Sequence, residues 1–222
     1  MSVVLVVAPH PDDEVLGVGG CILRHLAAGD AVHVVLCTRG EPERFGSDQV
    51  ERVQAEAREA HRFLGVTRSH FLDLPAARLD TLSGMDINVA LQGVFDAVQP
   101  DTVYVPHPGD VHRDHQLIFQ AAMVCCRPTG PRSPSRILAY ETVSETDWYA
   151  PPLTPAFVPN VFLDITSHLE KKLAGCAIYA SQIRPAPHQR SIEALRALSI
   201  VRGHTAGLAH AEAFRLVRER IS

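Results

Sequence analysis

The sequence contains few of the features that mark secreted or membrane-spanning proteins. It has five cysteines, an odd number, and no Cys-x-x-Cys pair. This pattern argues against a disulfide framework and a thiolate metal site, and favours a reducing, cytoplasmic compartment. The opening apolar run MSVVLVV carries no basic leader and is interrupted at Pro9 and His10. It is too short for a secretory signal or a spanning helix, so we expect no membrane insertion.

An excess of charge of one sign is also lacking. The chain has 21 basic and 25 acidic residues, a formal net charge of −4, so charge gives no reason to expect nucleic acid or an anionic membrane as a partner. A hydrophobic fraction of 46% and a charged fraction of 21% exclude collagen-like, disordered and coiled-coil classes. We expect one globular domain spanning residues 1–222 that acts on a neutral or small polar molecule.

Patterns typical of buried strands alternate with helical patterns along the chain. The expected strands are 3–7, 31–37, 69–72, 102–105, 137–141 and 161–165. The expected helices are 15–28, 47–64, 85–98, 119–126, 167–176 and a segment after Pro187 that ends at 201. The alternation predicts a three-layer α/β/α sandwich around a Rossmann-like, mostly parallel sheet. Residues 211–218 fit neither period, and 146–159, rich in proline and aromatic residues, is predicted to be an ordered loop or lid.

The first predicted strand is followed by residues of metal-binding type, in the run APHPDDE at positions 8–14. Ligand sites in open α/β sheets lie at the carboxyl ends of strands, where this run is expected. His10 and Asp13 offer the nitrogen and oxygen ligands that zinc accepts. Two ligands do not complete a site, so a third is required.

A second such segment, HPGDVHRDH at 107–115, follows the fourth predicted strand. Because neighbouring parallel strands end at the same edge of a sheet, the two segments are expected to converge, with His115 as the candidate third ligand. Two histidines and one carboxylate with an open position are typical of catalytic zinc, which activates a water molecule. Fe²⁺ and Mn²⁺ also suit this donor set.

Three neighbouring residues can assist such a water molecule. Asp12 is adjacent to Asp13, so it can hold the water without ligating the metal, as a general base requires; the alternative is that it caps the following helix. His112 can protonate a leaving group or stabilise an oxyanion. Asp114 can orient one of the imidazoles.

Taken together, PHPDDE and HRDH resemble the PIG-L/LmbE family of metal-dependent N-acetylglucosaminyl deacetylases. The similarity extends over most of the chain, to TRGE at 38–41, to Arg52 and Glu56 before LGV, and to FLDL at 71–74 and ASQ at 180–182. It implies an LmbE-like fold. Members are often homo-oligomers, trimers or hexamers, which is an expectation from the resemblance alone.

The resemblance also implies a role for each residue. The zinc ligands are then His10, Asp13 and His115. Asp12 is then the general base and His112 a protonated imidazole near the carbonyl, while Arg52 holds sugar hydroxyls; for Arg52 the alternative is a solvated helix face. The predicted function is zinc-dependent hydrolysis of the acetamide of an N-acetylglucosamine-containing sugar or glycoconjugate.

One departure from the family pattern concerns the substrate. After Leu74-Pro75 many relatives carry Asp-Gly, whereas this chain has Ala76-Ala77. The change motivates an alternative, an amidase of the same family acting on a thiol conjugate or secondary metabolite. A non-catalytic metal-binding module is a third possibility, but Asp12 and His112 are not needed for metal binding alone.

Overall fold

The computed structural model describes residues 1–130, 133–150 and 153–221. The strands are β1 (Val3–Ala8), β2 (Ala31–Arg39), β3 (Arg68–Pro75), β4 (Thr102–Pro106), β5 (Arg136–Tyr140), β6 (Val161–Asp164) and β7 (Ala211–Glu219). The helices are α1 (Asp13–Ala27), α2 (Pro42–Phe45), α3 (Ser47–Leu64), α4 (Gly84–Val98), α5 (Arg113–Cys125), α6 (Leu169–Ile178) and α7 (Ile192–Thr205), with a 3-10 turn at Leu79–Thr81. The order confirms the predicted α/β alternation.

The strands form one sheet in the order β3-β2-β1-β4-β5-β7-β6. Parallel pairing joins β3 to β2, β2 to β1, β1 to β4 and β4 to β5, whereas β7 is antiparallel to β5 and β6. The prediction of a mostly parallel sheet is confirmed. After β1 the chain continues to β2 and β3 on one side and then crosses to β4 on the other. At such a switch point the loops diverge and leave a crevice at the carboxyl ends of the strands.

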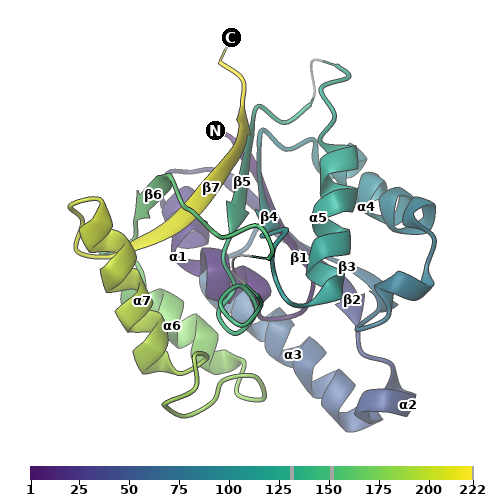
Figure 1. The fold of residues 1–222 in the computed structure, drawn as a ribbon, viewed down its shortest axis with the longest axis horizontal. Helices are drawn as coiled ribbons and strands as arrows, with labels where there is room; N and C mark the ends of the chain where they lie inside the picture. Colours follow the sequence, from purple (N-terminus) through teal and green to yellow (C-terminus); the bar gives the residue numbers. More distant parts are fainter. Residues whose placement is uncertain (131–132, 151–152, 222) are drawn as a thin grey trace.

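Helices cover both faces of the sheet (Figure 1). Because side chains alternate along a strand, Val4 and Val6 of β1 pack with residues of α1, α3, α6 and α7. Leu5 and Val7 point to the opposite face and pack with residues of α4 and α5. The sheet is therefore the middle of three layers, as the sequence predicts.

The segment that the sequence leaves undecided, residues 211–218, is strand β7. Its first four residues are buried, and the rest are exposed or half-buried in alternation. The first half is covered on both faces and the second half on one, so no single hydrophobic period describes the whole segment.

A buried ion pair connects α6 and β7 to the middle of α1. Lys172 Nζ donates to Glu212 Oε1 at 2.6 Å and to the Leu16 carbonyl at 2.8 Å. The two oxygens of Glu212 accept hydrogen bonds from the backbone N–H groups of Gly20 and Cys21, both at 2.8 Å. A Cβ on Gly20 would lie 2.6 Å from Ile165 Cγ2 on the neighbouring segment, so glycine permits this close packing.

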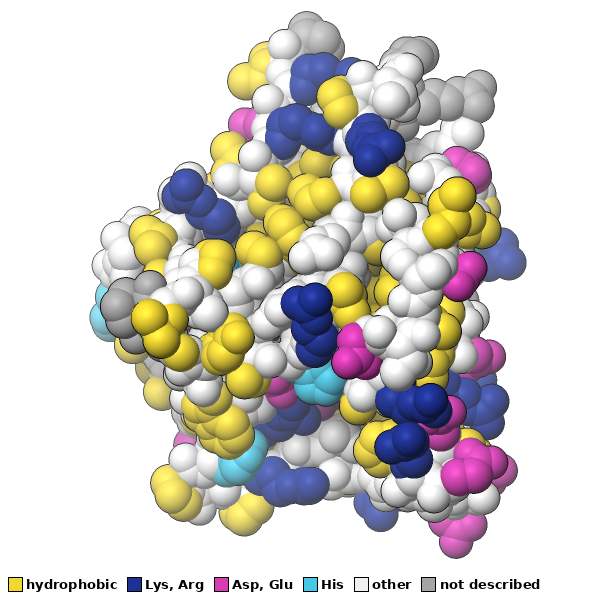
Figure 2. All heavy atoms as spheres, turned by 45° about the vertical axis from the view of Figure 1, so that its right-hand side comes forward, with side chains coloured by type: hydrophobic (Ala, Val, Ile, Leu, Met, Phe, Trp, Pro, Cys, Tyr) yellow, Lys and Arg dark blue, Asp and Glu magenta, His cyan; other side chains and the backbone are white. Residues whose placement is uncertain are grey.

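The surface carries charges of both signs. In the lower half of the face in Figure 2, acidic and basic side chains lie side by side. Over the described part of the chain, none of the helices has the length and apolar character needed to cross a bilayer.

Candidate active site

The two histidine-containing segments meet beyond the carboxyl ends of β1 and β4, which are neighbours in the sheet. The first segment leads from β1 into α1, which begins at Asp13, and the second leads from β4 into α5, which begins at Arg113. The ring centroids of His10 and His112 lie 4.4 Å apart. Residues about 100 positions apart in the sequence therefore share one site.

Three side chains of these segments converge on one point. His10 Nδ1 lies 3.2 Å from His115 Nε2, and Asp13 Oδ2 lies 3.2 Å from the same His115 nitrogen and 3.5 Å from His10 Nδ1. Asp13 and His115 are buried, and the His10 side chain is 20% exposed. The three residues form a group that can hold a metal ion.

The surroundings of His115 fit a bound cation. Asp110 Oδ2 lies 2.8 Å from His115 Nδ1, so in the neutral ring Nδ1–H donates to Asp110 and the Nε2 lone pair faces Asp13 and His10. Burial alone lowers the pKa of His115, but Asp13 and Asp110 outweigh burial and raise that pKa to about 10. Positive charge is thus stabilised between His115 and Asp13. Two imidazoles and a carboxylate in negative surroundings suit zinc.

Asp114 connects His10 to the loop after β3. Its Oδ2 atom lies 3.1 Å from His10 Nε2 and accepts a hydrogen bond from the Ala77 N–H at 2.6 Å, while Oδ1 accepts one from the Leu79 N–H at 3.2 Å. Ala77 has a φ of 57°, which a residue with a Cβ rarely adopts. Asp114 is therefore placed to orient the imidazole of His10, the role that the sequence suggests for it. It also binds the backbone at Ala77 and Leu79.

Asp12 has strained backbone geometry, with φ 113° and ψ −28°. Its N–H donates to Glu14 Oε2 at 3.2 Å, and its Oδ2 accepts a hydrogen bond from Arg190 Nη1 at 2.9 Å. Asp12 is the N-cap residue of α1, but its side chain makes no capping hydrogen bond, which disfavours the capping alternative. Burial raises the pKa of Asp12 to about 8, with Arg190 opposing the shift. A carboxyl with such a pKa suits proton transfer near neutral pH.

Glu14 lies fully buried behind Asp12. Its Oε1 atom accepts a hydrogen bond from Tyr179 Oη at 2.5 Å and lies 3.2 Å from His61 Nε2. The sequence gives no sign that His61 pairs with Glu14, because the two residues are 47 positions apart. Glu14 stabilises the strained turn by accepting the hydrogen bond from the Asp12 N–H, and it is not a lining residue of the cavity described below.

His112 is the N-cap residue of α5. Its Nδ1 atom accepts a hydrogen bond from the Asp114 N–H at 3.1 Å, which leaves Nε2 as the protonated nitrogen of the neutral ring. Burial, together with the neighbouring His10, lowers the pKa of His112 to about 4. The ring is therefore neutral near pH 7, unlike the protonated imidazole that the family resemblance implies. A neutral ring still donates one hydrogen bond.

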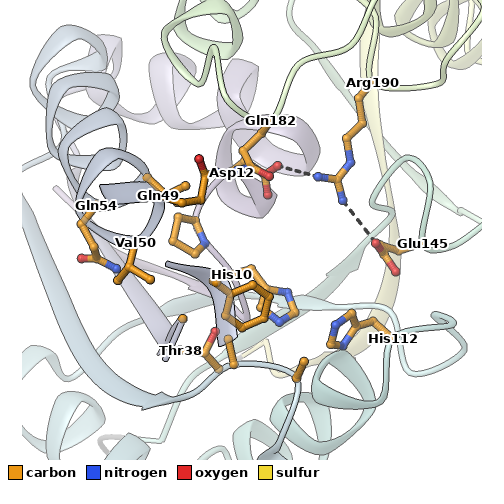
Figure 3. A pocket seen from close by; sticks show the side chains of 16 residues that line it. His10, Asp12, Thr38, Gln49, Val50, Gln54, His112, Glu145, Gln182 and Arg190 are labelled. Carbon is orange, nitrogen blue, oxygen red and sulfur yellow. Dashed lines mark hydrogen bonds and ion pairs between the residues drawn. The ribbon is translucent and has the colours of Figure 1, made fainter. Parts of the chain in front are cut away.

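Two further charged residues at the site belong to no recognised motif. Arg190 donates from Nη1 to Asp12 and from Nη2 to Glu145 Oε1 at 3.2 Å (Figure 3). Its Nε donates to Ser144 Oγ at 2.8 Å. Asp12 and Arg190 are 178 residues apart in the sequence. No sequence pattern therefore indicates that Arg190 and Glu145 lie at the site.

These residues border a cavity of about 280 Å³. His10, Asp12 and His112 are among the residues that line it, and Glu145 and Arg190 form one side in Figure 3. Helix α3 contributes the opposite side in Figure 3, where Val50 and Gln54 are drawn. The remaining lining residues are all uncharged: Pro11, Thr38, Gly40, Phe45, Gln49, Val53, Ala76, Ala77 and Gln182.

Arg52 lies outside this cavity lining. Its side chain is 58% exposed, and its Nε atom donates to Glu56 Oε1 at 3.1 Å. Glu56 also accepts hydrogen bonds from the N–H and Oγ of Ser181, at 3.1 and 2.5 Å. The structure thus brings the other predicted site residues together and places Arg52 apart from them, so its role as a substrate ligand stays a prediction.

The predicted lid, residues 146–159, packs beside the second histidine-containing segment. The Pro155 carbonyl lies 2.8 Å from His107 Nε2, and the Trp148 ring lies 5.3 Å from the His188 ring. Residues 151–152 lie outside the described residues. The loop thus contacts the second histidine-containing segment through Pro155, while its order and its closure over a substrate stay predictions.

Comparison with known proteins relates this chain to deacetylases. The profile of the PIG-L family, described as GlcNAc-PI de-N-acetylase, matches residues 5–126, which contain both histidine-containing segments. The uncharacterized deacetylase YaiS of Escherichia coli K12 is 30% identical over 167 residues, which are 72% of this chain and 80% of that protein.

Two further similarities extend over nearly the whole chain. Diacetylchitobiose deacetylase of Thermococcus kodakarensis is 26% identical over 227 aligned positions, covering 96% of this chain and 82% of that protein. The structure of the conserved protein TT1542 from Thermus thermophilus has a TM-score of 0.80 and 25% identity, covering 100% of this chain and 97% of that one. The resemblance is therefore not confined to the short motifs.

Proposed function

The chain belongs to the PIG-L family, and from this membership we propose that it is a zinc-dependent amide hydrolase that removes the acetyl group of an N-acetylglucosamine-containing sugar or glycoconjugate. The observation that carries the proposal is the convergence of His10, Asp13 and His115 beside a cavity that His10 and Asp12 line. The relatives named as deacetylases support the choice of an acetamide as the bond that is cleaved.

We assign metal binding to His10, Asp13 and His115. Zinc held there supplies a Lewis acid that polarises the amide carbonyl and lowers the pKa of water. Asp110 and Asp114 orient the two imidazoles, since each accepts a hydrogen bond from the ring nitrogen that faces away from the convergence point. The same donor set also suits Fe²⁺ and Mn²⁺, so metal analysis is part of the test.

Asp12 is assigned as the general base. It takes a proton from the attacking water at its carboxylate and then releases that proton to the departing amine. Arg190 holds Oδ2, and Glu14 holds the backbone N–H, so the carboxylate is fixed before substrate binds. This preorganisation avoids reorienting Asp12 during the reaction.

His112 is assigned as the donor to the carbonyl oxygen. Its Nδ1 atom is occupied by the Asp114 N–H, so the Nε2–H group of the neutral ring is available for the oxygen as negative charge develops on it. This N–H donor has a fixed orientation before substrate binds, because the His112 ring is held at the start of α5 by its hydrogen bond from the Asp114 N–H.

The test combines elemental analysis of the purified protein with amine release from N-acetylglucosamine and N,N'-diacetylchitobiose, each with and without chelator. The expected result is about one zinc per chain and amine release that stops on chelation and returns with zinc. Bound zinc without release from any N-acetylated sugar contradicts the assigned substrate and favours another amide. Absence of bound metal after zinc reconstitution contradicts the metal site itself.

A further inference from the structure

Helix α3 places the carboxamide of Gln54 at the cavity. The residue as a whole is only 7% exposed, and the side-chain hydrogen bonds among the described residues do not involve its amide. The amide atoms are not among the fully buried polar atoms that lack a partner, so they are accessible from the cavity. A carboxamide that borders a cavity with its donors and acceptor unused is available to a polar group of a ligand.

The rest of the lining shows what kind of ligand fits. Gln49 and Gln182 add two more carboxamides, and Phe45, Val50 and Val53 add apolar surface. Arg190 is the one Lys or Arg side chain among the described lining residues, and both Asp12 and Glu145 neutralise it. Away from the proposed zinc site, an anionic substituent would meet no unpaired Lys or Arg among these residues, whereas hydroxyl and amide groups would meet suitable partners.

We propose that Gln54 hydrogen-bonds an uncharged polar group of the substrate and makes the site selective for uncharged N-acetylated sugars over anionic ones. The inference rests on the proposed deacetylase function and adds a specificity-determining residue to it. A cavity of about 280 Å³ is at the small end of ligand sites, which suits recognition of a single sugar residue.

Helix geometry explains why Gln54 and not Arg52 reaches the cavity. Residues two positions apart on a helix point about 200° away from each other, so they occupy nearly opposite faces. Val50, Val53 and Gln54 lie at the cavity, while Arg52 is exposed and paired with Glu56. The similarity around Arg52 thus indicates the helix that borders the cavity, but the residue of that helix that reaches the cavity is Gln54.

The main test is steady-state kinetics of the zinc-loaded full chain with N,N'-diacetylchitobiose. In Gln54→Leu, KM is expected to rise roughly tenfold with kcat within about threefold of wild type, because a ligand hydrogen bond is lost while the reacting groups remain. Gln54→Asn, which withdraws the carboxamide by one methylene, provides a second variant and is expected to raise KM in the same direction. The matched control is Gln92→Leu on α4, where the glutamine bonds Asp96 outside this cavity, with KM expected to be unchanged.

Thermal unfolding separates recognition from stability. Similar melting temperatures for Gln54→Leu and wild type, with the raised KM, support the proposal. An unchanged KM in both Gln54 variants overturns it, as does an equal rise in KM in Gln92→Leu.

A second arm tests selectivity for charge. Wild-type kcat/KM for N-acetylglucosamine 6-phosphate is expected to be at least tenfold below that for N-acetylglucosamine; equal or higher values overturn the proposed selectivity.

Absence of turnover on every sugar is a failure of the proposed function. In that case a binding measurement tests whether Gln54 recognises the sugar. N-acetylglucosamine that binds wild type but not Gln54→Leu in saturation-transfer NMR supports the recognition role, and absent or equal binding overturns it.

Discussion

Two of the clusters of buried charged side chains that helix α1 contacts differ in whether they are complete by themselves. Near the middle of the helix, Lys172 and Glu212 neutralise each other, a carbonyl of α1 accepts from Lys172, and two N–H groups of α1 donate to Glu212. At its N-terminus, Asp13, His10 and His115 direct an oxygen and two nitrogens to one point, with no Lys or Arg there among the described contacts.

This difference separates structural charge from functional charge. Both clusters are buried, so burial does not distinguish them. The Lys172–Glu212 pair balances its own charges and hydrogen bonds, which is sufficient for a role in packing. The cluster at the N-terminus is satisfied only by an added proton or a cation, which is why it is the better candidate for ligand binding.

The largest expected effect comes from His115→Ala, which removes the centre of the incomplete cluster. We expect loss of bound zinc and a fall in amine release of roughly a thousandfold or more, because the metal site loses a ligand and Asp13 loses its partner. Elemental analysis and an amine-release assay measure the two effects. The control His204→Ala, at an exposed position on α7, should behave as wild type. A full complement of zinc in the His115 variant would argue against this ligand.

Asp12→Asn tests whether metal binding and proton transfer are separate. Asparagine has nearly the same shape and tolerates a positive φ, so the strained turn should persist. We expect normal zinc content and kcat lower by about 10²- to 10⁴-fold, since the amide cannot accept the proton. Metal analysis and kinetics on one preparation check this. A metal-free Asp12→Asn protein would contradict the division of roles between Asp12 and Asp13.

Lys172→Met tests the complete cluster. The substitution leaves Glu212 buried without its partner, so the free energy of unfolding should fall by about 3–5 kcal/mol. The double variant Lys172→Met/Glu212→Gln removes both charges and keeps an acceptor for one of the two α1 N–H groups, so it should recover part of that loss. Urea unfolding measures all three proteins. The folded variants should keep zinc and activity; loss of zinc in the double variant would show that the two clusters depend on each other.

The smallest expected effect is the pH dependence of this ion pair. Burial opposes the charged form, but Glu212 outweighs it and raises the pKa of Lys172 above its ordinary 10.5. A pKa raised on folding contributes stability that is complete below pH 10.5 and is lost as the pH rises through the folded-state pKa. Above pH 10.5 the wild type should therefore lose about 1.4 kcal/mol per pH unit more than the double variant until the folded-state pKa is reached. Parallel slopes in urea titrations at about pH 10–12 would contradict this.

Much of the fold and part of the site follow from local sequence. The β-branched runs that form β1, β2 and β4 are long enough to indicate buried strands, and motifs directly after β1 and β4 are expected at one edge of a parallel sheet. Strand order and the residues next to the strand ends are therefore enough to predict that His10, Asp12, Asp13, His112 and His115 lie together.

Other site residues cannot be found in this way. Arg190 and Glu145 lie in loops without periodicity, and they reach the cavity because two distant segments fold beside Asp12. Gln54 is one of several polar residues of α3, and it is at the site because its face of the helix borders the cavity. For β7, the change from full to partial burial within one strand removes the periodic signal.

By itself, the sequence determined the α/β class, the family and the chemistry of the donor set, because these depend on residue types and on short-range order along the chain. The tertiary structure alone decided which charges are paired, which imidazole nitrogen faces the convergence point and which face of α3 meets the cavity. These properties depend on distances between segments as far as 192 residues apart, such as α1 and β7, and short-range patterns do not encode such distances.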